Sequence, residues 1–311
     1  VYTQLSSGQG AQAGAFGSLA VLLDEDAAYR ASEQFACDRQ YWSEHLADRP
    51  EPVSLGGHTV AQSNGGFLRH TVYLERSIVR ELRAVADRIG VSLPQIITAA
   101  TAIFLHRLSG AADLVLGLPV AARGSAARCV PGMASNVLPL RLAMHPGMTV
   151  SEAISETAGQ MRRALEHKRC QIADLRGNLG GIVDRRALFG VSVNIMPFDY
   201  GFSFAGNRAV AYNLSLGPVD DLSIAVYDRS DGGPLRIDFD ANPAVHSAVD
   251  LADRQQRFLR LLTAVAEPDR AVGCLSILSS VERATILWGW NDTGRTIPSA
   301  TLPELFAAQA A

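Results

Sequence analysis

The feature that most constrains this sequence is a predicted helix over residues 93–108 that is apolar on most of its faces. Ser92 is a suitable N-cap for this helix, and Pro94 is tolerated in its first turn. A helix that is apolar nearly all round has to be buried. The next segment, Asp113–Ala121, is a continuous apolar run (DLVLGLPVA), which is typical of a strand covered on both faces. A buried helix followed by a buried strand predicts layers of helix and sheet.

The rest of the chain mixes helical and strand patterns in the same way. Ser77 and Thr149 are predicted to cap amphipathic helices, residues 19–46 have helical apolar spacing, and a last helix is expected over Ser247–Val265. Pro139 is expected near a strand end or a bulge. The mixture predicts an α/β (or α+β) sandwich. Strand composition marks the segments Arg69–Leu74, Asn136–Leu142, Val191–Met196, Ala209–Leu216, Leu222–Tyr227, Leu235–Phe239 and Val272–Leu278.

Composition narrows the classes of protein to which this chain can belong. Lys and Arg number 28 against 31 Asp and Glu, so the chain lacks the positive excess of a protein that neutralises many phosphates of a nucleic-acid duplex. No apolar run reaches the ~18–20 residues that a membrane span needs. The four cysteines include no C-x-x-C pair, which disfavours a disulfide framework and favours a reducing compartment. We therefore expect a cytoplasmic protein with no nucleic-acid or membrane partner.

Patterns that carry catalytic chemistry are mostly absent. The sequence has no Walker-type G-x-x-x-x-G-K-[ST], no G-x-S-x-G and no H-x-x-x-H among its seven histidines, so no metal site is expected. His246 and Asp250 have the H-x-x-x-D spacing of a base and its orienting acid in several acyltransferases. Because they fall at a predicted helix start, where an acidic side chain stabilises the dipole, we favour a structural interpretation. The pair Asp220–Asp221 is interpreted as part of a turn.

Several motifs occur in an informative order. Asp38–Leu46 (DRQYWSEHL) is similar to Y-W-x-x-x-L, and LPVAAR followed by GMASNVLPLR is similar to G-R…G-x-x-x-N-x-L-P-L-R. Arg185–Asn194 (RRALFGVSVN) is similar to R-x-P-L-F-x-V-x-F-x-x-Q, with Ala187 in place of the proline. Ser280–Ala311 contains W-N-x-T followed by L-x-x-L-F-x-x-Q-A. In this order the motifs resemble those of a condensation domain of a nonribosomal peptide synthetase, followed by the linker into an adenylation domain.

The resemblance implies a chloramphenicol-acetyltransferase-like lobe of a V-shaped domain, in which two lobes enclose a tunnel. Residues 1–48 would be the tail of the N-terminal lobe, the polar stretch 49–66 the inter-lobe linker, and residues 67–278 the C-terminal lobe. Residues 279–311 would be a linker and the first helix of an adenylation domain. The family's H-H-x-x-x-D-G motif would lie upstream of Val1, so we expect no catalytic residue in this chain.

The resemblance also implies a reaction and a set of partners. A donor acyl or peptidyl thioester on one peptidyl carrier protein would be joined to the amine of an acceptor aminoacyl thioester on another. Phosphopantetheine arms of the carrier proteins would deliver both substrates, and no cofactor would be bound directly. The other expected partners are the adjoining adenylation domain and the missing N-terminal lobe.

The resemblance assigns roles to a few residues of this chain. Asn136, Ser135 and Asn194 are expected along the substrate tunnel, and Arg123 and Arg141 are expected to be structural, bridging residues. The amide of Asn136 has the donors and the acceptor to bind a pantetheine amide. A turn role for Asn136 at the start of its strand remains equally open.

Two functions remain open from the sequence. The first is an amide-forming condensation domain, of which this chain alone is predicted to be inactive. The alternative is a non-catalytic condensation-like lobe that serves as a docking scaffold for carrier proteins. An H-H-x-x-x-D-G-like run encoded upstream of Val1 would favour the first.

Overall fold

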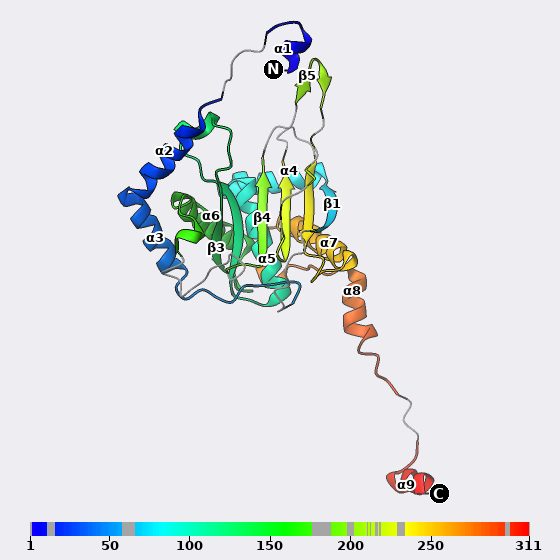
Figure 1. The fold of residues 1–311 in the computed structure, drawn as a ribbon. Coiled ribbons are helices and arrows are strands. Elements are labelled where there is room, and N and C mark those ends of the chain that lie inside the picture. The colour runs from blue at the N-terminus through cyan, green and yellow to red at the C-terminus, as the bar shows by residue number, and fades with distance from the viewer. Residues whose placement is uncertain are drawn as a thin grey trace. The chain divides into compact units, whose positions relative to one another are not determined.

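The computed structural model describes two compact units, Val1–Ile277 and Leu278–Ala311 (Figure 1). The first unit holds the sheet and the candidate site, and the second consists of short helices and extended chain. The residues that the structure describes are 2–10, 16–57, 66–175, 188–197, 202–209, 211, 213, 214, 217, 219–228, 234–295 and 299–310.

The first unit is built on a six-stranded mixed sheet. Its strands are β1 (Leu68–Leu74), β2 (Asp113–Ala121), β3 (Ser135–Ala143), β4 (Val191–Met196), β7 (Leu222–Tyr227) and β8 (Leu235–Ala241). They lie in the order β1-β8-β7-β4-β2-β3, and β4 runs parallel to both β2 and β7, whereas the other pairs are antiparallel. The short strands β5 (Ser203–Phe204) and β6 (Asn207–Arg208) form a separate hairpin.

The two faces of the sheet differ in polarity because successive side chains of a strand point to opposite faces. One face carries apolar side chains on its central strands, and most of them are buried, among them Leu114, Leu116, Val191, Val193, Ile224, Val226, Ile237 and Phe239. On the other face, the register sets Gly117, Ser192, Ser223, Asp240 and Arg69 in one row across five strands. The sheet therefore has one face for packing and one face for polar contacts.

Helices cover the apolar face. They are α4 (Arg76–Ile89), α5 (Leu93–Ser109), α6 (Val150–Glu166) and α7 (Ala248–Ala264). α5 packs on β2 and β4, α6 on β3, and α7 on β1 and β8 (Figure 1). The ring of Phe258 on α7 lies 5.4 Å from that of Phe104 on α5 and 5.6 Å from that of Phe239 on β8, measured between centroids. All residues of α5 from Leu93 to His106 except Pro94 and Gln95 are buried, which confirms the predicted core helix.

Local sequence signals explain where several helices begin and end. Ser92 with Gln95, and Thr149 with Glu152, form capping boxes at the starts of α5 and α6. Gly90 ends α4 in the left-handed conformation, with φ of 76°, which costs little without a Cβ atom. The starts of α5 and α6 agree with the predicted caps Ser92 and Thr149.

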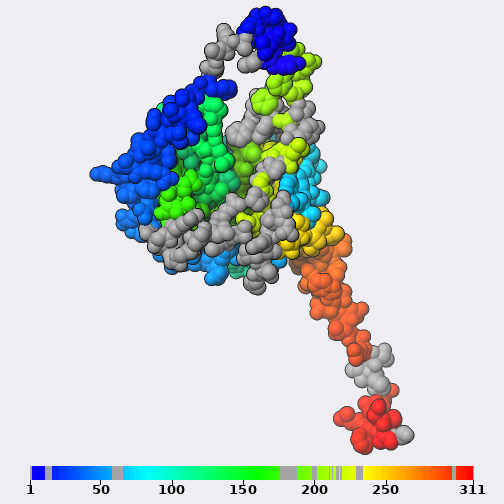
Figure 2. Space-filling view, viewed as in Figure 1, coloured from blue at the N-terminus to red at the C-terminus, as the bar shows by residue number. Residues whose placement is uncertain are grey.

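The N-terminal helices α2 (Leu19–Arg30) and α3 (Glu33–His45) lie against the green part of the chain near α6 (Figure 2). The buried carboxylate of Asp38 accepts a hydrogen bond of 2.6 Å from the Tyr29 hydroxyl and lies 2.8 Å from Nδ1 of His167. The indole of Trp42 donates to the carbonyl of His167 over 3.0 Å. Burial, reinforced by Asp38, raises the pKa of Tyr29. These contacts fasten α3 to the end of α6.

The second unit contains α8 (Ser280–Ala284), the π-helical turn η5 (Thr285–Gly289) and α9 (Leu302–Ala310). Ser279 and Glu282 form a capping box at the start of α8. Trp288 and Trp290 are each 73% exposed within this unit. Among the described residues, no one helix combines the length and apolarity that a membrane span requires, although α4 and α5, set at 102° to each other, meet that criterion as a pair.

The structure corrects several predicted elements. α4 begins at Arg76 after Glu75, so Ser77 lies inside it and is not its cap. Pro139 lies in the middle of β3 and not near its end; β3 is an edge strand, where a missing N–H is tolerated. The described residues of Ala209–Leu216 (209, 211, 213 and 214) form no strand.

Val272–Leu278 is also not a strand, because a 3₁₀ turn, η4 (Val272–Cys274), occupies its first half. The amides of Val272 and Gly273 donate to the carbonyls of Met148 and Pro146. These bonds take the place of a sheet ladder.

Candidate functional site

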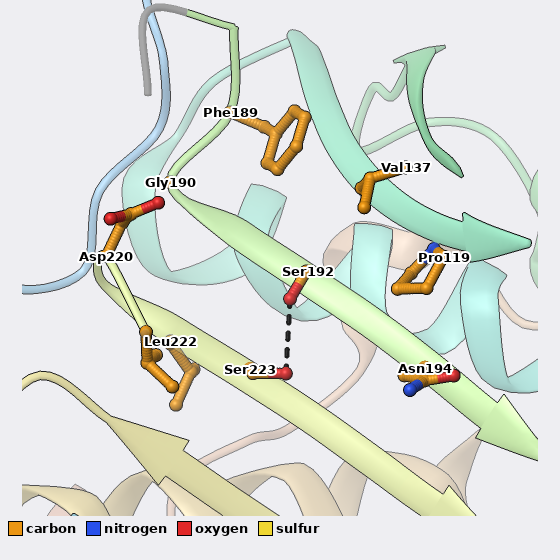
Figure 3. A pocket seen from close by; sticks show the side chains of 10 residues that line it. Pro119, Val137, Phe189, Gly190, Ser192, Asn194, Asp220, Leu222 and Ser223 are labelled. Atoms are coloured by element: carbon orange, nitrogen blue, oxygen red, sulfur yellow. Dashed lines mark hydrogen bonds between the residues drawn. The ribbon is translucent and has the colours of Figure 1, made fainter. Parts of the chain in front are cut away.

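A pocket of about 210 Å³ opens on the polar face of the sheet, between β2, β4 and β7 (Figure 3). Its floor comes from side chains at matching register on adjacent strands, and its rim comes from the turns that precede β4 and β7. The lining residues are Pro119, Val137, Phe189, Gly190, Ser192, Asn194, Val219, Asp220, Leu222 and Ser223.

The floor of the pocket is polar and uncharged. The hydroxyl of Ser192 donates a hydrogen bond of 3.1 Å to that of Ser223 (Figure 3). Asn194 lies two residues further along β4 on the same face, and its half-buried amide makes no hydrogen bond to any residue that the structure describes. The floor therefore keeps donors and acceptors for a bound group.

The shape of the pocket depends on two glycines. A Cβ atom at Gly117 would lie 2.4 Å from the Phe189 ring, so only glycine allows that ring to lie against β2. A Cβ atom at Gly190 would lie 2.6 Å from the carbonyl oxygen of Val53. Gly190 thus lets the segment that leads out of α3 pass directly beside the pocket rim.

A buried polar cluster, which we call the Asp221 clamp, lies next to this rim and consists of Asp221, His246, Arg254, Leu55 and Gly56. The Asp221 carboxylate accepts hydrogen bonds from the amides of Leu55 (2.8 Å) and Gly56 (3.2 Å), and it lies 2.5 Å from Nε2 of His246. Arg254 contacts Nδ1 of His246 and donates to the carbonyl of Leu55 over 2.7 Å. The clamp joins three segments that are far apart in the sequence.

The partners of His246 settle its tautomer. The guanidinium of Arg254 can only donate, so Nδ1 accepts and Nε2 carries the proton that it donates to Asp221. Asp250, the predicted partner at H-x-x-x-D spacing, instead binds the N-cap Ser247, and its hydrogen bonds lower the pKa of Asp250. The helix-start interpretation therefore holds for Asp250, whereas the pairing of His246 with Asp221 was missed.

A second buried charge cluster extends the polar face beyond the pocket. Asp238 and Asp240 on β8 are both fully buried. Arg69 binds Asp240 through two nitrogens, at 2.6 and 3.0 Å, and Arg236 binds Asp238 at 2.9 and 2.7 Å. Arg69 also donates to the carbonyl of Asn213, so the cluster holds this part of the chain over the sheet. Both carboxylates are paired with arginines and are therefore not available for general acid–base chemistry.

The residues predicted for the tunnel separate in the structure. Asn194 lines the pocket, whereas Ser135 and Asn136 begin β3 outside it. The buried amide of Asn136 donates to the carbonyls of Lys168 (3.0 Å) and Cys170 (2.8 Å), so both of its N–H groups are used inside the chain. Asn136 thus holds the start of β3 to the chain that follows α6. A contact between Asn136 and a pantetheine amide stays a prediction.

The two predicted bridging arginines bind groups of this chain. Arg123 donates to the carbonyls of Ala127, Val130 and Gly132 and closes the loop between β2 and β3. Arg141 binds Asp113 at 2.7 Å and Asp48 at 2.7 Å, which raises the pKa of its guanidinium. Arg141 thus ties the end of α3 to the sheet edge. Bridging by either arginine to another lobe stays a prediction.

Comparison with known sequences assigns the family. The sequence profile of the condensation domain matches residues 1–287. The chain belongs to the condensation domain family. It is 45% identical over 311 residues to a dimodular nonribosomal peptide synthase of Bacillus subtilis (strain 168), covering 99% of this chain and 13% of that protein. It is 41% identical over 283 residues to an isonitrile lipopeptide synthase of Streptomyces coeruleorubidus, covering 90% of this chain and 19% of that protein.

Solved structures agree with this assignment. The first condensation domain of the calcium-dependent antibiotic synthetase, in complex with a substrate analogue, has a TM-score of 0.82 at 35% identity and covers 90% of this chain. A starter condensation domain of rhizomide synthetase, in complex with C8-CoA and Leu-SNAC, has a TM-score of 0.79 at 39% identity and covers 89%. The α/β prediction and the recognition of a nonribosomal peptide synthetase condensation domain are confirmed. This condensation-domain chain spans 62–63% of those two structures and a far smaller share of the curated relatives.

Proposed function

We propose that this chain forms one wall of the substrate tunnel of an amide-forming condensation domain in a modular, cytoplasmic nonribosomal peptide synthetase. The match to the condensation domain family over residues 1–287 carries the proposal. Phosphopantetheine arms of an upstream and a downstream peptidyl carrier protein would bring the donor acyl or peptidyl thioester and the acceptor aminoacyl thioester. The acceptor amine would attack the donor carbonyl, forming the C–N bond and releasing the pantetheine thiol.

The contribution of this chain to that reaction would be orientation. Asp220 is the one titratable side chain among the described residues that line the pocket, and no described lining residue is a histidine. We assign proton transfer, or the positioning of the amine, to an H-H-x-x-x-D-G motif upstream of Val1. Holding two reactants in the right geometry is itself a large catalytic effect. Asn194 and Ser135 are our candidates for contacts along the tunnel.

The proposal includes a division of the chain. Residues 1–48 would complete the N-terminal lobe, residues 49–66 would link the lobes, and residues 67–278 would be the C-terminal lobe. Residues 279–311 would lead into an adenylation domain. The separation of a second unit at Leu278 supports this last boundary, although the family profile extends to residue 287.

The alternative is a condensation-like lobe that only docks carrier proteins. These 311 residues contain no two adjacent histidines, so they do not include the motif that would distinguish the two functions. The two functions make different demands on the pocket, because docking does not require substrate to enter it.

The test uses the whole synthetase polypeptide that contains this chain, with loaded donor and acceptor carrier proteins and mass spectrometry of the product. We expect amide product from the native protein, and we expect Ser192→Trp, which fills the pocket, to reduce it at least 100-fold. Ser203→Trp, the same change on the exposed β5–β6 hairpin, is the matched control and should retain activity. Carrier binding without any amide product from the native protein would support the docking alternative. Product formed by the isolated 311-residue chain would overturn its predicted inactivity.

A further inference from the structure

We propose that the pocket between β2, β4 and β7 binds a neutral hydrogen-bonding group, an amide or a hydroxyl, carried at the end of an apolar segment of a substrate, and that Asn194 and Ser223 recognise it. This inference deepens the proposed function, because it names the chemical class of group that a substrate would place in this pocket.

The unused hydrogen-bonding capacity of the floor points to such a group. Asn194 offers two N–H donors and one carbonyl acceptor, and none of them has a partner among the described residues. Ser192 donates its hydroxyl hydrogen to Ser223, which leaves the Ser223 hydrogen available to an incoming acceptor. A ligand that pairs with this half-buried amide replaces the water that otherwise hydrates it, which gives a modest net gain for each hydrogen bond. Donors and acceptors lie side by side here, which suits an amide or a hydroxyl.

The described lining residues favour a neutral group over an anionic one. They include no Lys, Arg or His, so none of them would neutralise a carboxylate or phosphate. Asp220 is the one charged side chain among them. Figure 3 shows Asp220 at the end of the pocket away from Asn194, so none of the described lining residues beside Asn194 is charged.

The walls explain why the recognised group should end an apolar segment. Pro119, Val137, Phe189, Val219 and Leu222 enclose the space above the floor. A cavity of 210 Å³ holds roughly seven waters at ~30 Å³ each, so a short aliphatic chain with a polar tip fits in it. Burying the chain against these walls is favourable, and the polar tip then reaches Asn194.

The test measures binding directly and so does not depend on catalysis. Saturation-transfer NMR observes the ligand and therefore suits the whole synthetase polypeptide. The probes are pentanamide and pentanoate, which have the same shape and differ in charge. We expect pentanamide to bind at least tenfold more tightly than pentanoate, and Asn194→Leu to weaken pentanamide binding about tenfold. Asn207→Leu, the same change in the exposed hairpin, is the control and should leave binding unchanged.

The outcomes separate this inference from the proposed function. Equal binding of the two probes, or unchanged pentanamide binding in Asn194→Leu, would overturn the inference even if the native synthetase forms amide product. Selective pentanamide binding without amide product would support the inference and count against the proposed function. If Asn194→Leu fails to fold by circular dichroism, Ser223→Ala replaces it, with an expected loss of at least threefold.

Discussion

Removal of the Asp221 carboxylate should destabilise the first unit more than any other single change near the pocket. Asp221→Ala leaves two donors without an acceptor, the amide of Leu55 and Nε2 of His246, whereas the amide of Gly56 keeps its hydrogen bond to the Ser54 hydroxyl. His246 has a fully buried side chain, so water does not readily replace that partner. A buried donor left unsatisfied costs about 1–3 kcal/mol, and two such donors remain here. We expect a loss of about 4 kcal/mol.

Urea unfolding followed by tryptophan fluorescence measures this loss. With an m-value of about 3 kcal/mol/M, the midpoint should fall by about 1 M without a change in slope. The matched control is Asp253→Ala, because Asp253 lies exposed on α7 and should change stability by no more than about 0.5 kcal/mol. A double-mutant cycle with His246→Ala should give a coupling of about 1–3 kcal/mol. A loss below about 1 kcal/mol for Asp221→Ala would refute the clamp as a stabilising contact.

Three further predictions follow from the packing. Gly117→Ala should displace the Phe189 ring, lower the free energy of unfolding by about 1–3 kcal/mol and weaken pentanamide binding. An unchanged unfolding free energy together with unchanged pentanamide binding would contradict the close contact between Gly117 and Phe189. Asn136→Ala should lower the free energy of unfolding in urea by about 2 kcal/mol, because the carbonyls of Lys168 and Cys170 lose their donor. An unchanged unfolding free energy would mean that the Asn136 amide is free for substrate. Burial raises the pKa of Cys170 to about 12, so iodoacetamide at about pH 9 should modify only the exposed thiols of the native chain. Mass spectrometry identifies the modified cysteines, and early labelling of Cys170 would argue against its burial. The exposed thiols are Cys37, Cys129 and Cys274.

Local patterns in the sequence were sufficient to predict most elements of the sheet and of its helical cover. The apolar run Asp113–Ala121 is β2 with the predicted bounds, and Thr149 caps its helix as expected. The helix expected over Ser247–Val265 is α7, Ala248–Ala264, with Ser247 as its N-cap. Such signals act over a few residues, through the periodicity of burial and through the unpaired amides at helix starts. The order of motifs is likewise readable from the sequence alone, and it indicates the condensation domain family.

Only the tertiary structure decided the partners of polar side chains and the place of the pocket. His246 pairs with Asp221, 25 residues away, and not with Asp250, because the turn before β7 and the start of α7 meet beside Leu55. Asn194 lines the pocket because β4 lies between β2 and β7 in the sheet and Asn194 lies on the polar face of that sheet. Contacts of this kind depend on which distant segments pack together, and no local propensity encodes that. The sequence by itself determined most of the elements and the family, while packing decided which side chains hold the site together and which remain available to a ligand.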